Sequence, residues 1–316
     1  MTAINPTQAA FLTQDPTAKW LLEQFPFPLT IAKVFPFIGV DGGTLSVPST
    51  GAMNPAEIVP ATANVSTLDQ TAVPVATDFF IGYYFTRYEL EYSAQDGFKF
   101  PNDIDEAQGM LAVRRLLYAF FRGLENGVST YPTPPGVYGL LNGHGGQIKS
   151  AGTPGTFSLT EFYESYHLIV ANDGRPNAIM STKAAQLDYI NACVAAGINL
   201  EYVDFEWDDP IKGKVKAPIL SVLGTPWYIN GALTEDDNIF FMVLGFNGQA
   251  TTGRGITGIV PSQLLRDMFV RRKMPATYED VGASTYEMFG KESISYSWPV
   301  GVAVGSPGAL SIYTGF

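Results

Sequence analysis

The chain has 316 residues, 46% of them hydrophobic, and a formal net charge of −11 at pH 7, so one large domain or two smaller ones could bury a substantial core. No basic run is longer than Arg271-Arg272-Lys273, which excludes a dedicated nucleic-acid reader, because such a protein needs a basic stripe against phosphates. One cysteine, Cys193, excludes an intrachain disulfide framework and a cysteine-based zinc site, and its setting predicts a buried core thiol.

Residues 1–27 are predicted to form an N-terminal arm with a short amphipathic helix after Asp15-Pro16. The segment lacks the basic start and apolar run of a signal peptide, and no run of eighteen apolar residues occurs in the chain. We therefore expect a soluble protein, made in a cytosol, without membrane contact.

Residues 28–75 are predicted to form an extended β-hairpin loop. The two segments "LTIAKVFPFIGVDGG" and "TLSVPSTGA" are strand-like and meet at Asp41-Gly42-Gly43, a hairpin signal. Between residues 29 and 78 only five side chains are charged: Lys33, Asp41, Glu57, Asp69 and Asp78. A stretch this long and apolar cannot bury itself alone, so it packs on its own domain or lies across a neighbouring chain.

A strand over "DFFIGYYFTRYELEYS" leads into the longest helix, predicted for Asp103–Leu124 with Asn102 or Asp103 as its cap. One face is apolar at three- and four-residue steps: Ile104, Ala107, Leu111, Leu117, Phe120, Phe121 and Leu124. At 1.5 Å per residue this helix spans roughly 30 Å, enough to cross a domain.

The segment "VSTYPTPPGVYGLLNGHGG" follows that helix and is rich in glycine and proline. A phosphate-binding loop needs its glycines before a helix N-terminus, and here they come after a C-terminus. The segment is therefore interpreted as a structural corner, with Gly136, Gly139 and Asn142 as its residues.

Residues 158–209 are predicted to contain a helical or mixed segment, then a strand, a helix and a strand, with Ser181 as the helix cap and Gly197 at its end. The later segments "KAPILSVLGTPWYINGAL" and "NIFFMVLGF" are predicted as strands, and "PSQLLRDMFVRRKM" as a short helix or an irregular strand. The segment "SISYSWPVGVAVGSPGALSIYTGF" predicts a strand pair joined by a proline–glycine turn.

Chemical motifs are few. Residues 253–258 match the dinucleotide-binding glycine fingerprint, but Pro261 follows where a helix should begin, so a flexible loop is expected. His144 and His167 are the two histidines, and no G-x-S-x-G nucleophile motif occurs. His167 is expected in the core or at its boundary. No catalytic residue, cofactor site or metal site is predicted.

The acidic segment "EYVDFEWDDP", residues 201–210, is the strongest candidate for chemistry. On a strand, Asp204, Glu206 and Asp208 share one face, so they could serve glycoside hydrolysis or bind a hard cation. A half-buried strand with a solvated acidic face is the favoured alternative.

The order of these elements resembles the tailed-phage major capsid protein, whose shell fold is shared with encapsulins. Asp103–Leu124 resembles its spine helix, Gly139-Leu140-Leu141-Asn142 resembles a frequent turn, "NAIMSTKAAQLDYINA" is similar to its second helix and "VLGTPWYINGAL" to a later strand. The resemblance covers residues 28–316, while the family's long N-terminal extension is missing.

This resemblance implies an α+β phage major-capsid shell fold. Its parts are the arm (1–27), the extended hairpin loop (28–75), a peripheral domain with spine helix and sheet (76–127 and 238–316) and an axial domain (128–237). The hairpin is then an assembly interface formed by Phe35, Phe37, Ile38, Val40, Leu45, Val47, Ile58 and Val59. Replacing residues 37–73 with a short Gly/Ser linker is then expected to leave a folded subunit that forms no particles.

The implied function is structural and not enzymatic. Copies assemble as hexamers and pentamers into an icosahedral shell that encloses double-stranded DNA without reading its sequence. Assembly is expected in the host cytoplasm, without a cofactor and with separate scaffolding, portal and decoration proteins. Two alternatives stay open: an encapsulin-type compartment with enzyme cargo, and a glycosidase that uses the acidic cluster around Glu206.

Overall fold

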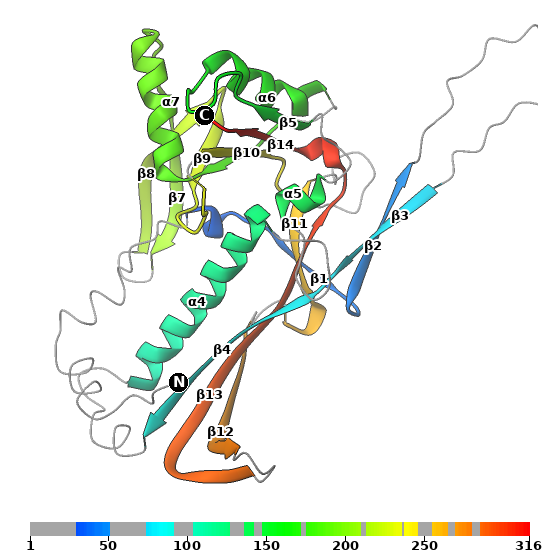
Figure 1. The fold of residues 1–316 in the computed structure, drawn as a ribbon, viewed down its shortest axis with the longest axis vertical. Helices are drawn as coiled ribbons and strands as arrows, with labels where there is room; N and C mark the ends of the chain where they lie inside the picture. The colour runs from blue at the N-terminus through cyan, green and yellow to red at the C-terminus, as the bar shows by residue number, and fades with distance from the viewer. Residues whose placement is uncertain are drawn as a thin grey trace, which may run out of the picture.

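The computed structural model describes residues 30–50, 74–91, 104–126, 136–141, 147–171, 175–209, 213–235, 237–245, 255–264, 269–279 and 285–316. Within them the chain is a mixed α+β protein, as predicted, with two large sheets, a two-stranded ribbon and one long helix (Figure 1). None of the described helices is long and apolar enough to cross a membrane. The arm at 1–27, Ile58, Val59, Asn142 and His144 lie outside the described residues.

A five-stranded sheet is organised around β13 (Thr285–Val304), which is 20 residues long. On one side β13 pairs antiparallel with β4 (Gly82–Glu91), and on the other with β12 (Val270–Glu279) and β11 (Ile256–Pro261). A short strand, β1 (Phe37–Val40), continues the sheet parallel to β11.

The spine helix, α4 (Ile104–Asn126), lies along this sheet and confirms the predicted long helix (Figure 1). Its apolar face is buried: Leu116, Phe120, Phe121 and Leu124 belong to one hydrophobic core with residues of both large sheets. The Phe120 ring stands 5.0 Å from the ring of Trp298 on β13. The helical period in the sequence thus marks the face that packs on the sheet.

Two glycines let α4 approach the sheet closely. A Cβ at Gly109 would lie 2.7 Å from the Tyr296 hydroxyl, and a Cβ at Gly123 would lie 2.8 Å from the Tyr84 hydroxyl. The two glycines are fourteen residues apart, which places them on one face of the helix. Burial under this face raises the pKa of Tyr84 to about 12.

We expect Gly123→Ala to destabilise the protein, although alanine is the better helix former by about 1 kcal/mol. The added methyl group would press on a tyrosine that Phe120 and Trp298 hold in place. In a Tyr84→Phe background, which lacks the hydroxyl, the same change should be neutral or stabilising. Urea unfolding of the two single variants and the double variant measures this coupling, and purely additive effects would contradict it.

A seven-stranded sheet forms the other half of the molecule, in the order β5-β14-β10-β6-β9-β8-β7. Its strands are β5 (Ile148–Ser150), β6 (Ala178–Ser181), β7 (Glu201–Asp209), β8 (Gly213–Val222), β9 (Thr225–Ile229), β10 (Asn238–Met242) and β14 (Leu310–Thr314). Helices α6 (Leu159–Ala171) and α7 (Lys183–Ala195) lie beside this sheet (Figure 1). The aromatic core that α6 and α7 share with the sheet contains Phe162, Tyr189, Trp227, Phe241 and Tyr313.

Strand β10 is buried on both sides. Ile239 and Phe241 face the core of α6 and α7, whereas Phe240 and Met242 face the core that contains α4. This strand, with β14, follows residue 237, yet both lie in the middle of the seven-stranded sheet. The predicted domain boundary between residues 237 and 238 therefore assigns β10 and β14 to one domain and the other five strands of their sheet to another, so this sheet crosses the boundary.

Two predicted hairpins are wrong, because the strands of each pair with other strands and not with one another. After Asp41-Gly42-Gly43 the chain reverses, with Gly42 at φ 106°, but β1 pairs with β11 and not with the strand that follows. The predicted pair near the C-terminus fails in the same way. Strand β13 lies in the five-stranded sheet and β14 in the seven-stranded sheet, connected by a 3-10 turn (Pro307–Ala309).

A buried polar cluster connects α4 to the seven-stranded sheet. Glu125, with 0% exposure, accepts hydrogen bonds from the Thr234 backbone N–H (2.8 Å), the Thr234 hydroxyl (2.6 Å) and the Asn238 amide (3.1 Å). The carbonyl of Asn238 in turn accepts from the Tyr138 hydroxyl at 3.1 Å and from Thr314. One carboxylate therefore holds the end of the spine helix to β10, and through Asn238 to β14.

Smaller differences concern capping. The hydroxyl that caps α7 belongs to Thr182, which accepts from the Ala185 N–H at 3.2 Å, and not to Ser181, which ends β6. Gly197, with φ 69°, ends the helix as predicted. The segment after Pro261 contains a 3-10 turn (Ser262–Leu264) before β12.

Candidate assembly interface

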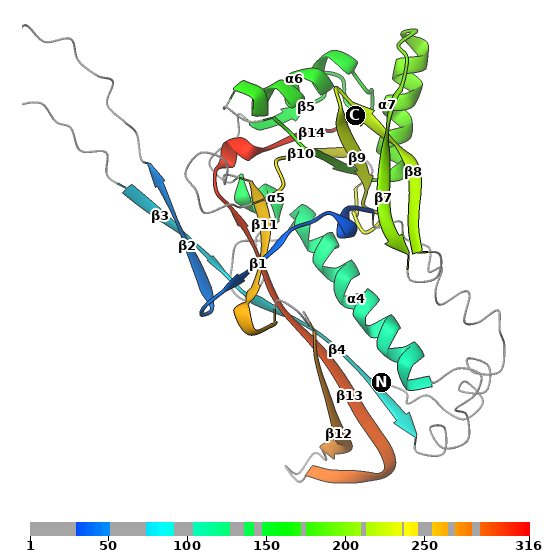
Figure 2. The ribbon, with the colours of Figure 1, turned by 180° about the vertical axis from the view of Figure 1, so that it is seen from behind.

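The two-stranded ribbon of β2 (Thr44–Thr50) and β3 (Pro74–Phe80) leaves the body of the molecule and points outward (Figures 1 and 2). The strands pair antiparallel from Thr44 opposite Phe80 to Thr50 opposite Pro74. Among the described residues neither strand pairs with a third strand. At the base, the Ile81 N–H donates to the Gly43 carbonyl at 3.0 Å, and Phe79 and Ile81 are buried.

The structure divides the predicted interface residues into two groups. Phe35 (5% exposed) and Val40 (9%) are buried in the core, and Phe37 and Ile38 pack against it. The cause is the pairing of β1 with β11: the Phe37 ring covers Gly258 and lies 5.7 Å from the Trp298 ring. Phe35 and Val40 thus belong to the subunit's own core, with Phe37 and Ile38 partly buried against it.

The second group belongs to the ribbon. Leu45 packs at its base against the core, and Val47 lies further along β2. Ile58 and Val59 belong to the segment between β2 and β3, which the structure does not describe. The interface role proposed for the loop therefore rests on the part of the chain after Gly43.

The glycine-rich segment after α4 contains a helical turn. Gly136 precedes α5 (Val137–Leu140), and its carbonyl accepts from the Leu140 N–H at 2.8 Å. Val137 and Leu141 are buried in the core with α4. Gly136 and Gly139 thus lie where the chain packs back onto the spine helix, and their role as a corner stays a prediction.

The dinucleotide-like motif is a buried strand where the structure describes it. Gly255 precedes β11, and Gly258 lies within it, so the expectation of a flexible loop is wrong for this part. A Cβ at Gly258 would lie 2.2 Å from the Phe37 ring, and one at Gly255 would lie 2.4 Å from the Val243 carbonyl oxygen. The glycines serve close packing, and a 3-10 turn of three residues takes the place of the helix that a nucleotide would need.

The acidic strand β7 forms a ribbon with β8, and lysines stand opposite its carboxylates. Glu206 pairs with Lys216 in the register and forms an ion pair with it, and Asp208 stands opposite Lys214. On the other face Phe205 packs on Tyr228, with ring centroids 5.5 Å apart. No group of three or more His, Cys, Asp and Glu side chains placed to hold a metal occurs in the described residues. Asp204 and Glu206 are exposed on this ribbon, as the solvated-face interpretation requires.

We expect the acidic strand to contribute little to stability. Asp204→Asn combined with Glu206→Gln should change the free energy of unfolding by less than about 1 kcal/mol, because exposed ion pairs are weak. Thermal melting with and without calcium measures this. A loss of several degrees, together with calcium stabilising the wild type alone, would instead indicate a structural metal site.

The remaining reactive side chains are ordinary. Cys193 is fully buried on the inner face of α7, which confirms the predicted core thiol. His167 is exposed on α6, outside the core, and lines an open groove of about 450 Å³ with Lys149, Glu164 and Leu168.

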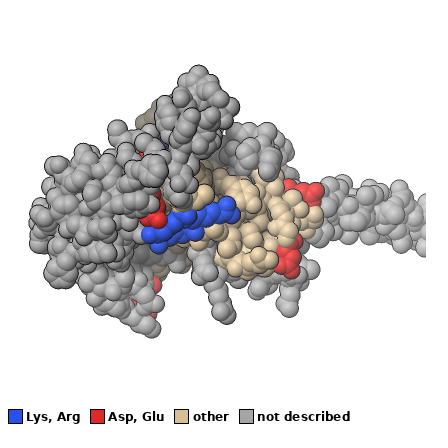
Figure 3. Space-filling view, turned by 90° about the horizontal axis from the view of Figure 1, so that it is seen from below, with Lys and Arg blue, Asp and Glu red and all other residues tan. Residues whose placement is uncertain are grey.

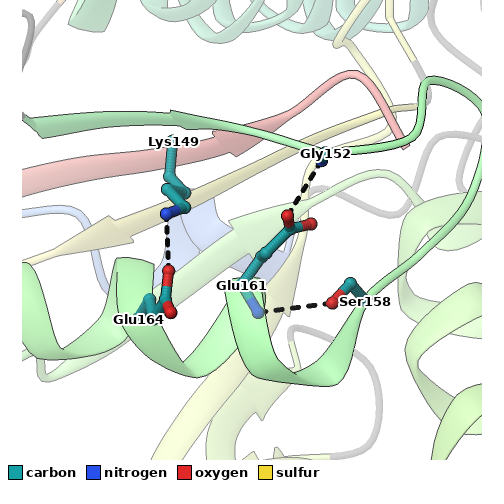
Figure 4. Close-up of polar contacts among 5 residues, drawn as sticks. All are labelled: Lys149, Gly152, Ser158, Glu161 and Glu164. Atoms are coloured by element: carbon teal, nitrogen blue, oxygen red, sulfur yellow. Dashed lines mark hydrogen bonds and ion pairs between the residues drawn. The ribbon is translucent and has the colours of Figure 1, made fainter.

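Figure 4 shows the polar contacts beside this groove. Lys149 on β5 and Glu164 on α6 form an ion pair, which raises the pKa of Lys149 through a hydrogen bond to Glu164. Ser158 accepts from the Glu161 N–H at the start of α6, and Glu161 accepts from the Gly152 N–H at 2.9 Å. These contacts fix α6 to β5 and contain no nucleophile with a general base.

Figure 3 shows one face of the molecule, seen from below. The described residues visible there are mostly other than Lys, Arg, Asp and Glu, with one elongated basic group and small acidic groups, one of them beside the basic group. Such a surface suits contact between subunits, because desolvating few charges costs little free energy.

No protein-family profile matches the sequence, and no curated protein matches it. Solved structures do match. The holo-SrpI encapsulin complex of Synechococcus elongatus has a TM-score of 0.64 at 14% identity, over 90% of this chain and 86% of that chain. A chain of Mycobacterium phage Bobi has a TM-score of 0.62 at 12% identity, over 99% of both chains. The capsid of a native GTA particle has a TM-score of 0.52 at 12% identity, over 90% of this chain and 89% of that chain. The protein thus has the shell fold of phage major capsid proteins and encapsulins.

Proposed function

We propose that the protein is a structural shell subunit that self-assembles into an icosahedral capsid enclosing double-stranded DNA. The observation that carries this is the whole-length fold match, over 99% of this chain and 99% of the Bobi chain. In this function, hexamers and pentamers of the subunit form in the host cytoplasm and become the virion shell, with scaffolding, portal and decoration proteins as separate partners.

The described geometry suits this role. The ribbon of β2 and β3 extends away from the body with no third described strand beside it, and an assembly of copies can cover its edges. The spine helix and the five-stranded sheet form a rigid plate, because aromatic rings fill the space between them. A net charge of −11 keeps the inner surface from trapping packaged DNA, so enclosure needs no sequence-specific contact and no cofactor.

An encapsulin-type compartment that encloses enzyme cargo is the second candidate. The match to the holo-SrpI encapsulin complex over 90% of this chain favours it. Both candidates use the same shell, so they differ in contents.

Purification of the protein followed by negative-stain microscopy and nuclease treatment tests both. Closed particles containing nuclease-protected DNA of genome length support the capsid. Closed particles with a single copurifying enzyme and no protected DNA support the compartment. A protein that stays monomeric at high concentration, in the presence of its native partners, would contradict a shell function.

A further inference from the structure

The outer face of α7 carries exposed apolar side chains. Ala184, Leu187, Asn191 and Val194 recur at steps of three and four residues on one face of the helix, and Ile198 follows shortly after its end. Leu187 is 55% exposed, Val194 67% and Ile198 42%. The name "α7 stripe" is used below for these five residues.

The α7 stripe lies opposite the face that holds the helix in the fold. Ala185, Tyr189 and Cys193 are buried, and the Tyr189 ring packs on Phe162 and Trp227. Leu187 precedes Tyr189 by two residues, which turns it about 160° away around the helix. The stripe therefore adds nothing to the subunit's own core. A surface helix normally carries charged residues on such a face.

The groove lined by Lys149, Glu164, His167 and Leu168 lies toward the other end of the same half of the molecule. Strand β5, which carries Lys149, is one edge of the seven-stranded sheet, and β7, which directly follows α7, is the other edge. Figures 1 and 2 show α7 beside β7 and β8, whereas α6 lies along β5 and β14, although the two helices share one core on the same face of the sheet. A surface that protrudes at one end and a hollow at the opposite end suit head-to-tail contact between identical copies.

Charge supports the same pairing. Lys183 and Asp188 are the two charged side chains of α7, one of each sign, and both are exposed. The groove also carries one of each sign, Lys149 and Glu164, with side chains that are 40% and 51% exposed. Asp188 can face Lys149 of a neighbouring copy while Lys183 faces Glu164, so the contact leaves no charge of either kind in excess.

The area of the stripe indicates what sort of partner covers it. Its exposed side chains offer on the order of a few hundred Å², below the roughly 800 Å² per partner of a standard stable interface. A binary complex through this face alone would be weak. In a closed ring every copy makes the contact twice, once through the stripe and once through the groove, and further contacts add to it.

We propose that the α7 stripe of one copy docks into the α6–β5 groove of the next copy and so forms a ring of subunits. This inference rests on the proposed self-assembly and specifies one contact within it. The partner is a second copy of this chain, bound head to tail through Leu187 and Val194 on one side and Leu168 and His167 on the other.

Cysteine cross-linking tests the contact directly. Leu187→Cys and His167→Cys are made as separate variants with tags of different length, and native Cys193 does not react because it is buried. The two variants are coexpressed and oxidised after assembly. We expect a disulfide-linked heterodimer band from the mixture and none from either variant alone. Dimers from Leu187→Cys alone would mean that the α7 stripes of two copies face each other, which would overturn the head-to-tail contact. The absence of any cross-link in assembled particles would overturn it as well.

A charge test separates this contact from assembly in general. Leu187→Glu with Val194→Glu should keep the circular dichroism and melting temperature of the wild type and lose rings and particles. Gln186→Glu, which adds charge to the same helix away from the stripe, should assemble normally. Particles of normal size from the double variant would overturn the contact and leave the shell function intact. Wild-type protein that stays monomeric, or a different protein covering the stripe in native particles, would overturn the contact as well, and the monomeric result would also remove the proposed function.

Discussion

Shortening the β2–β3 ribbon is expected to abolish particle formation while the subunit stays folded. Ser46 stands opposite Asp78 in the register, so residues 47–77 can be replaced by an Asn-Gly turn that closes the two strands. The base of the ribbon, with Leu45, Phe79 and Ile81, stays in place, so the core loses nothing. The interfaces between copies would lose the whole loop, which costs most of the area that a stable contact needs.

Sedimentation and circular dichroism together measure this result. We expect a cooperatively melting monomer or small oligomer with the helical signal of α4 intact. Normal particles from this variant would refute the role of the loop as a strap between copies.

A matched deletion of residues 37–73 should behave differently. The sequence alone suggested that it would be tolerated, but it removes β1, whose Phe37 and Val40 belong to the core. Loss of these side chains costs several kcal/mol, enough to unfold a typical domain. An insoluble product from this deletion, beside a folded product from the shorter one, would locate the start of the loop after Gly43.

Glu125→Ala is expected to produce the largest loss of stability from a single substitution, about 3–5 kcal/mol. The change removes a fully buried acceptor from the Thr234 N–H and hydroxyl, and it leaves the buried Asn238 amide with Glu235 alone as its acceptor. Glu125→Gln keeps one acceptor oxygen and should cost less. Arg122→Ala, exposed one turn earlier on the same helix, should change the free energy of unfolding by less than about 0.5 kcal/mol.

Urea unfolding measures the free energy of unfolding of these variants. Because the carboxylate connects α4 to β10, Glu125→Ala should also reduce hydrogen-exchange protection at both ends of the connection, in α4 and in the seven-stranded sheet. Equal stability of Glu125→Ala and Arg122→Ala would show that the cluster does not hold the two halves together.

The local features of the fold were predictable because they depend on residues close in sequence. The spine helix follows from its apolar period, and the buried Cys193 from its place on the inner face of α7. The turn at Gly42-Gly43 was also visible, but turn chemistry predicts a reversal and not a pairing partner. Strand β1 finds its partner at β11, where the Thr257 hydroxyl donates to the Pro36 carbonyl across 221 residues of chain. No local signal specifies such a pairing.

Two functional features were missed for different reasons. Glu125 lies at the end of a helix, where a charged residue normally meets solvent, and its partners come from a loop and a strand more than 100 residues away. The α7 stripe, in contrast, left a signal. Between Lys183 and Glu201 the sequence has a single charge, Asp188, and apolar residues on both faces of a helix, one more face than the subunit's own core uses.

The placement of β13 and β14 constrains when the subunit can fold during its synthesis. Strand β13 is the central strand of one sheet, and β14 separates β5 from β10 in the other, so the first sheet is not complete before residue 304 is made and the second not before residue 314. The Ser311 hydroxyl donates to the Ser165 carbonyl, and the Thr30 hydroxyl donates to the Ile229 carbonyl, so contacts at both ends of the chain bridge 146 and 199 residues. A nascent chain would hold α4 with its apolar face uncovered while it waits for these strands, and contacts of this separation form slowly. Until β13 and β14 are made, the nascent chain is no finished subunit on which an assembly could start too early.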